Sequence, residues 1–106
     1  MKKQIFEKYR PLGFLWGSEL LLKHKQAVHF INDCERMSLV IVGMDFFKKE
    51  EDGIVPLLNT ADYSSISQSA DAVQRSIAAA RKLLKDGLPD NATWVSFDIK
   101  KGKWAV

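Results

Sequence analysis

Two histidines and one cysteine, residue types that often ligate metals or attack substrates, lie close together between residues 24 and 34. His24 and His29 are five residues apart, so they do not share a helix face as an i, i+4 ligand pair would. His29 and Asp33 have that spacing, but a metal site needs a further ligand, and a surface ion pair explains the spacing. Cys34 has acidic neighbours, which raise the pKa of a thiol. We expect a buried structural thiol there, and neither a metal site nor a nucleophile.

Other catalytic signatures are also missing from the sequence. The six glycines are scattered singly, so there is no phosphate-binding loop and no dinucleotide fingerprint. Asp45 interrupts a strongly apolar stretch, and it has no paired carboxylate to form a general acid–base dyad. Two interpretations of Asp45 stay open: it caps a turn where the sheet ends, which we favour, or it binds a partner. We expect no enzyme activity, no cofactor and no metal.

The formal net charge of +3 is distributed unevenly along the 106 residues. Residues 1–25 carry six Lys and Arg against two acids, residues 26–71 three against eight, and residues 72–106 seven against three. The acids of the middle segment are Asp33, Glu35, Asp45, Glu50, Glu51, Asp52, Asp62 and Asp71. A local acidic patch steers a basic protein partner even when the total charge is positive.

A second candidate surface lies near the C-terminus, where aromatic and basic residues gather: Trp94, Phe97, Lys100, Lys101, Lys103 and Trp104. Such a cluster could stack bases beside phosphate contacts. Phe97, however, shares a strand face with Val95 and Ile99, which predicts a core position. Three lysines at a terminal turn are also typical of a solvated hairpin. Nucleic-acid binding is therefore the alternative, and protein binding is preferred.

The elements that position these residues follow from length and pattern. A chain of 106 residues with 46% hydrophobic residues builds one core, so we expect a single domain over residues 1–106. One cysteine excludes an intramolecular disulfide. The first residues are amphipathic and charged, without the apolar run of a secretory signal, and the longest apolar run is Leu39 to Met44. We expect a soluble cytoplasmic protein with no membrane contact and Cys34 reduced.

Hydrophobic periodicity and turn residues predict the following elements along the chain. They are a short helix in residues 1–10, a helix from about Glu19 to Glu35 with Ser18 as N-cap, a strand from Leu39 through Phe47, a charged turn over Lys48–Gly53, a strand over Ile54–Leu58, a loop over Asn59–Ser69, a helix from about Ala70 to Leu84 capped by Ser67 or Ser69, and a strand from Trp94 to Ile99. A final hairpin into Trp104–Val106 stays open.

These elements predict a small α+β domain with a mainly antiparallel sheet of three or four strands and two or three helices, in the order ααββαβ(β). The run Leu39–Val42 is apolar on both faces, which places its strand at the centre of the sheet. Pro56 cannot donate to a ladder and pushes its strand to the edge. We expect the strand after the last helix to pair on the other side of the central strand, through a right-handed crossover.

Several short motifs follow one another in an order that is known from one protein family. A helix leads into a strand that ends in Gly43-Met44-Asp45, and a hairpin with a charged turn follows. A loop then carries Asn59 and Tyr63, a helix contains Arg75-Ser76-Ile77, and Val95 to Ile99 forms a last strand. Over residues 12–99 this arrangement resembles small bacterial immunity proteins of polymorphic-toxin and contact-dependent growth inhibition systems.

The resemblance implies a non-catalytic protein that binds a toxin domain and blocks its active site or substrate surface. Many such toxins are nucleases with basic clefts, which an acidic surface complements. On this basis the predicted partner-binding residues are Asp33, Glu35, Asp45, Glu50, Glu51, Asp52, Asp62 and Tyr63.

Overall fold

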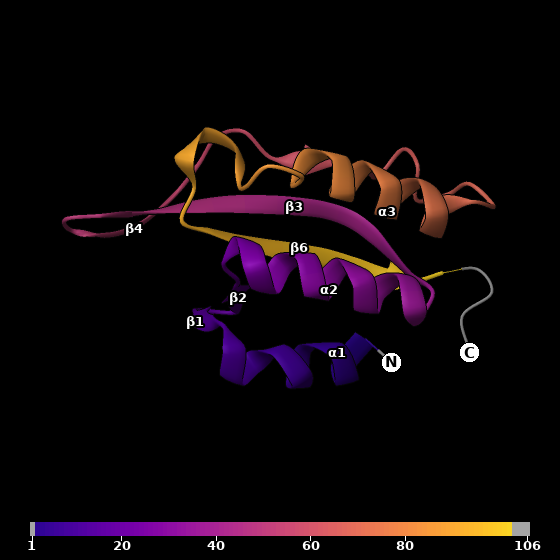
Figure 1. The fold of residues 1–106 in the computed structure, drawn as a ribbon, viewed down its shortest axis with the longest axis horizontal. Coiled ribbons are helices and arrows are strands. Elements are labelled where there is room, and N and C mark those ends of the chain that lie inside the picture. Colours follow the sequence, from indigo (N-terminus) through magenta and orange to yellow (C-terminus); the bar gives the residue numbers. More distant parts are fainter. Residues whose placement is uncertain (1, 103–106) are drawn as a thin grey trace.

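A computed structural model describes residues 2–102 (Figure 1). Its elements are α1 (Lys2–Tyr9), η1 (Arg10–Leu12), β1 (Phe14–Trp16), β2 (Glu19–Leu21), α2 (His24–Arg36), β3 (Leu39–Glu50), β4 (Gly53–Pro56), β5 (Ala61–Asp62), α3 (Ala72–Leu83), η2 (Pro89–Asn91) and β6 (Trp94–Lys101). The predicted α+β class is confirmed, with three helices, a four-stranded sheet whose pairings are all antiparallel, and a small two-stranded sheet.

The twelve-residue strand β3 is the centre of the main sheet. Gly43 pairs with Asp62 of β5 and with Asp98 of β6, and Phe47 pairs with Pro56 of β4 and with Trp94 of β6. A strand residue has only two neighbours in a sheet, so β4 and β5 share one edge of β3 and β6 lies along the other. The predicted central strand, the edge strand with Pro56 and the placement of the last strand are confirmed.

A β-bulge in β3 decides which side chains face the core. The register with β6 shifts between Ile41 and Gly43, so Val42 is an extra residue on β3. Because one inserted residue reverses the alternation, Leu39 and Ile41 share the core-facing side with the even-numbered Met44 and Phe46. Asp45 is thereby carried to the opposite side. The strand continues through Asp45 to Glu50, so the favoured interpretation of Asp45 as a turn cap is wrong.

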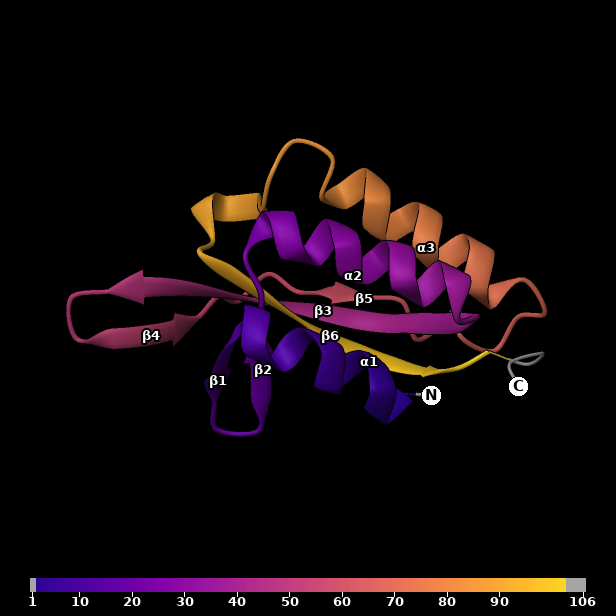
Figure 2. The ribbon, with the colours of Figure 1, turned by 60° about the horizontal axis from the view of Figure 1, so that its bottom comes forward.

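All three helices lie on the same face of the sheet. Side chains of α1, α2 and α3 join the strand residues in one hydrophobic cluster, in which Phe30 of α2 stacks on Phe97 of β6. Figure 2 shows α2 and α3 side by side over this face, and Figure 1 shows α1 beside α2. We call the other side of the sheet the open face, because none of the three helices covers it. No helix in residues 2–102 is long and apolar enough to cross a membrane.

The region before α2 differs from the prediction. The predicted helix from Glu19 is wrong at its start, because β1 and β2 form an antiparallel hairpin there and α2 begins at His24. Gly17 has a φ of +61° at the first turn position, which a two-residue hairpin loop requires. The run Leu20–Leu22 fits a helix stripe and a strand equally well, and the turn at Gly17 decides for the strand.

The predicted helix caps are also wrong. Lys23 precedes α2, where Ser18 was expected, and Asp71 precedes α3, where Ser67 or Ser69 was expected. The hydroxyls of both serines donate instead to carbonyls of their own loop. The predicted hairpin into Trp104–Val106 lies outside the described residues.

Candidate functional site

Carboxylates gather in the middle of the open face. Asp62 and Asp98 are the two neighbours of Gly43 across the sheet, so their side chains leave the sheet on the same side with only a glycine between them. Asp45, two residues further along β3, pairs with Ser96 and faces the same side. Asp45, Asp62 and Asp98 are all exposed. Two predicted partner-binding residues, Asp45 and Asp62, thus meet on one surface.

Glu19 of β2 extends this group, which we call the open-face carboxylates: Glu19, Asp45, Asp62 and Asp98. Partial burial raises the pKa of Asp45 above its ordinary value, and the negative charges of Glu19 and Asp98 raise it further. No Lys, Arg or His among residues 3–102 lies within salt-bridge distance of any of the four. The surface therefore holds negative charge that the described part of the chain does not neutralise locally.

An aromatic cluster borders the carboxylates at the β1–β2 end of the sheet. Phe14 stacks on Trp94 with ring centroids 5.8 Å apart, and Trp16 meets Phe47 edge to face at 5.5 Å. Phe47 and Trp94 are direct cross-strand partners, and they lie one pair beyond Asp45 and Ser96. The open face thus combines free carboxylates with aromatic side chains, a residue type that is enriched at protein-binding surfaces.

Asp33 has a structural role inside the fold. Its carboxylate accepts hydrogen bonds from Lys8 Nζ and Tyr9 Oη, both at 2.7 Å, and from Arg36. Burial alone would raise the pKa of Asp33, but these three donors outweigh it and lower the pKa to about 2. The predicted ion pair with His29 is wrong, since Asp33 joins α2 to α1 instead. With 8% of its surface exposed, Asp33 offers a partner little area.

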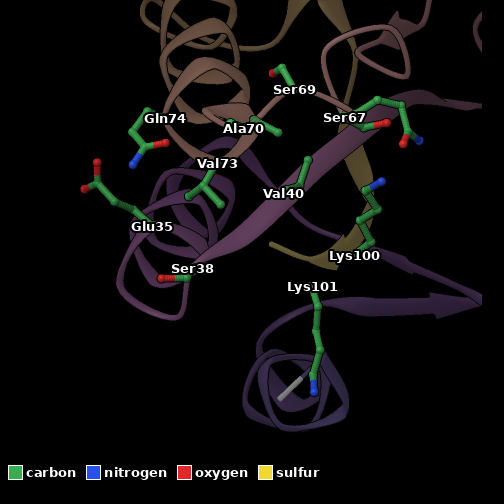
Figure 3. A pocket seen from close by; sticks show the side chains of 12 residues that line it. Glu35, Ser38, Val40, Ser67, Ser69, Ala70, Val73, Gln74, Lys100 and Lys101 are labelled. Carbon is green, nitrogen blue, oxygen red and sulfur yellow. The ribbon is translucent and has the colours of Figure 1, made fainter. Parts of the chain in front are cut away.

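Glu35 lies at the end of α2 and is tied to α3. Arg81 donates to both Glu35 oxygens at 2.8 and 3.0 Å and also to Asn32, which lowers the pKa of Glu35. Glu35 borders a groove of about 490 Å³ at the start of β3, which Ser38, Val40 and the loop over residues 67–70 also line (Figure 3). Glu35 therefore lies apart from the open-face carboxylates.

The remaining predicted residues are dispersed. Glu50, Glu51 and Asp52 form the tip of the β3–β4 hairpin, which projects from the body of the molecule (Figure 2). Seven residues of β3 separate Glu50 from the level of Asp62, which is about 23 Å along the strand. Tyr63 packs against the hydrophobic cluster, and burial raises its pKa. The predicted acids consequently do not form one patch.

Sequence reasoning missed Glu19, Asp98, Phe14 and Trp16. Asp98 was not among the predicted binding residues because residues 72–106 are basic in total. Its place in the alternation of β6 nevertheless puts it on the side opposite Val95 and Ile99. The predicted helix from Glu19 excluded a hairpin in this region, so the pairing of Trp16 with Glu19 was not expected. The signal that could have found them is the pair Gly17-Ser18 between two short apolar runs.

The histidines and Cys34 form no reactive site. Within residues 2–102 no group of three or more His, Cys, Asp or Glu is placed to hold a metal ion. His24 hydrogen-bonds the backbone carbonyl of Leu84 at the end of α3. Cys34 is fully buried, and burial followed by the charge of Asp33 raises the pKa of its thiol to about 12. A thiol with that pKa is not a nucleophile at neutral pH.

The predicted basic and aromatic surface near the C-terminus is divided. Lys100 and Lys101 leave β6 in opposite directions (Figure 3). Trp94 stacks on Phe14 and shares its face with Asp98, whose charge opposes phosphate. Lys103 and Trp104 lie outside the described residues. The described part of this region offers no continuous basic surface.

Comparison of the chain with protein-family models, with curated proteins and with solved structures gives no match in any of the three.

Proposed function

We propose that this chain is a cytoplasmic immunity protein that binds a cognate toxin domain and neutralises it without catalysis. The observation that carries the proposal is the open face, where unneutralised carboxylates and aromatic side chains lie together on the side of the sheet that no helix covers. Its charge complements the basic substrate cleft of a nuclease-type toxin. The motifs over residues 12–99 that resemble immunity proteins support the same function.

The mechanism would be occlusion. A surface bearing Asp45 and Asp98 competes with a polyanionic substrate for the same Lys and Arg side chains of the toxin. Because the inhibitor only has to occupy that cleft, it needs neither a nucleophile nor a cofactor. One molecule would then neutralise one toxin domain.

The direct test is protection of cells. Bacteria that express the toxin domain encoded beside this gene should stop growing, and co-expression of the wild-type protein should restore growth. The double variant Asp45→Lys, Asp98→Lys should protect poorly, because it presents cations to a basic cleft. Asp86→Lys, an exposed site beyond α3, is the matched control for charge reversal. Failure of the wild-type protein to restore growth would rule out this function.

A further inference from the structure

The β1–β2 hairpin exposes neighbouring apolar side chains. Leu12, Phe14, Leu15 and Trp16 are 52, 47, 52 and 37% exposed, and they lie within five residues of one another. Single exposed apolar residues are normal on a soluble protein, but a contiguous group marks an interaction site. We call these four residues the hairpin ridge.

The ridge is held in one conformation before any partner arrives. Its two aromatic rings rest on Trp94 and Phe47 of the main sheet. Gly13, just before β1, permits close approach of this segment to β2, since a Cβ there would lie 2.7 Å from the Leu21 carbonyl oxygen. Side chains fixed in this way lose little conformational entropy on binding.

Hollows flank the ridge on two sides. Leu15 borders a groove of about 250 Å³ next to Leu20 and Phe97. Phe14 borders another of about 440 Å³ next to Leu21 and Trp94. Exposed aromatic and aliphatic side chains with a groove on each side can pack closely against a partner surface of complementary shape.

The charges around the ridge differ between its two ends. Glu19 pairs with Trp16 at the turn, and the charges of Glu19 and Asp98 both act on Asp45. Lys23 and Lys25 border the groove at the Phe14 end, and Arg10 borders the groove beside Leu15, on the side of the hairpin away from Trp16. A partner that seats on the ridge therefore needs cations beside Trp16, and the two ends fix its orientation.

We propose that the hairpin ridge is the anchor by which this protein binds its toxin domain, entering an apolar groove bordered by Lys and Arg side chains. Because neighbouring strand residues point to opposite sides, Trp16 contacts one wall of that groove and Leu15 contacts the other. This inference rests on the proposed function and adds to it the interface and the chemistry of the partner. The carboxylates steer the partner to the face, and the ridge holds it there.

The test compares truncations of the ridge in binding to the purified toxin domain encoded beside the gene. Leu15→Ala and Trp16→Ala should each raise Kd by about tenfold or more, mainly through faster dissociation. Trp16→Phe should recover part of the loss. Leu83→Ala, an exposed leucine of α3 on the helical side, should leave Kd within about twofold. Because Trp16 packs on Phe47, circular dichroism must show that each variant is folded; Leu15 is the more exposed of the two anchors.

The outcomes separate the two proposals. If the wild-type protein protects cells and both alanine variants bind as tightly, the ridge is not the anchor and the proposed function stands. If the wild-type protein neither binds nor protects, the proposed function fails. A wild-type dimer in sedimentation that Leu15→Ala converts to monomer would assign the ridge to a second copy. Loss of binding to phosphatidylglycerol vesicles in that variant would assign it to a lipid surface. Either result would overturn the inference.

Discussion

At the scale of single residues, Asp33 shows how a charge can be structural. Its carboxylate gathers Lys8, Tyr9 and Arg36 at the junction of α1 and α2, and the hydroxyl of Tyr9 is buried there with it. We expect Asp33→Asn to lower the free energy of unfolding by about 1–3 kcal/mol, because the donors lose a charged acceptor. Chemical denaturation at pH 7 measures this change. Asp71→Asn, at an exposed site beside Arg75, should change stability by less than about 0.5 kcal/mol.

The same carboxylate predicts a dependence of stability on pH. The pKa of Asp33 is lowered from 3.8 to about 2 in the folded state, so the unfolded chain binds more protons between these values. The contribution of Asp33, about 2 kcal/mol, is complete above about pH 5 and is lost as the pH falls towards 2. Denaturation curves of wild type and Asp33→Asn should therefore converge over this interval. A constant difference between the two proteins from pH 5 to pH 2 would contradict the assignment.

At the scale of elements, the bulge in β3 and helix α3 depend on each other. The fully buried Ser76 Oγ of α3 accepts a hydrogen bond from the Ile41 amide at 3.1 Å, directly beside the bulge. Ser76→Ala leaves that amide without its partner, and we expect a loss of about 1–3 kcal/mol in the free energy of unfolding. Ser65→Ala, in the exposed loop before α3, should be close to neutral. Equal stabilities of the two variants would show that Ser76 does not support the bulge.

At the scale of the whole molecule, two groups of acids compete for the role of contact surface. One group is the open-face pair Asp45 and Asp98, and the other is the hairpin tip Glu50–Asp52. Asp45→Lys with Asp98→Lys should slow association with the toxin domain by about tenfold at low salt, and the effect should shrink as salt screens the charges. Folding should survive, because both sites are exposed and the new lysines gain Glu19 and Asp62 as neighbours of opposite charge. Stopped-flow fluorescence at two ionic strengths measures the association rates.

The hairpin tip is the internal comparison for that experiment. Reversal of Glu50, Glu51 and Asp52 changes more charge, yet it should slow association less, because the tip stands about 23 Å along β3 from the level of Asp62. A larger effect at the tip than on the open face would move the contact surface to the β3–β4 hairpin.

The amino-acid sequence by itself determined the α+β class, the central apolar strand, the edge position of the strand with Pro56 and the core role of Phe97. Each follows from periodicity or from the covalent chemistry of one residue, which act locally. Only the tertiary structure decided that Asp45 faces outward, because one extra residue at Val42 reverses the alternation of β3. It also brought Asp98 and Glu19 close to Asp45. It also decided that Asp33 is internal. Sequence distance does not encode which strands become neighbours, and neighbouring strands are what bring these carboxylates together.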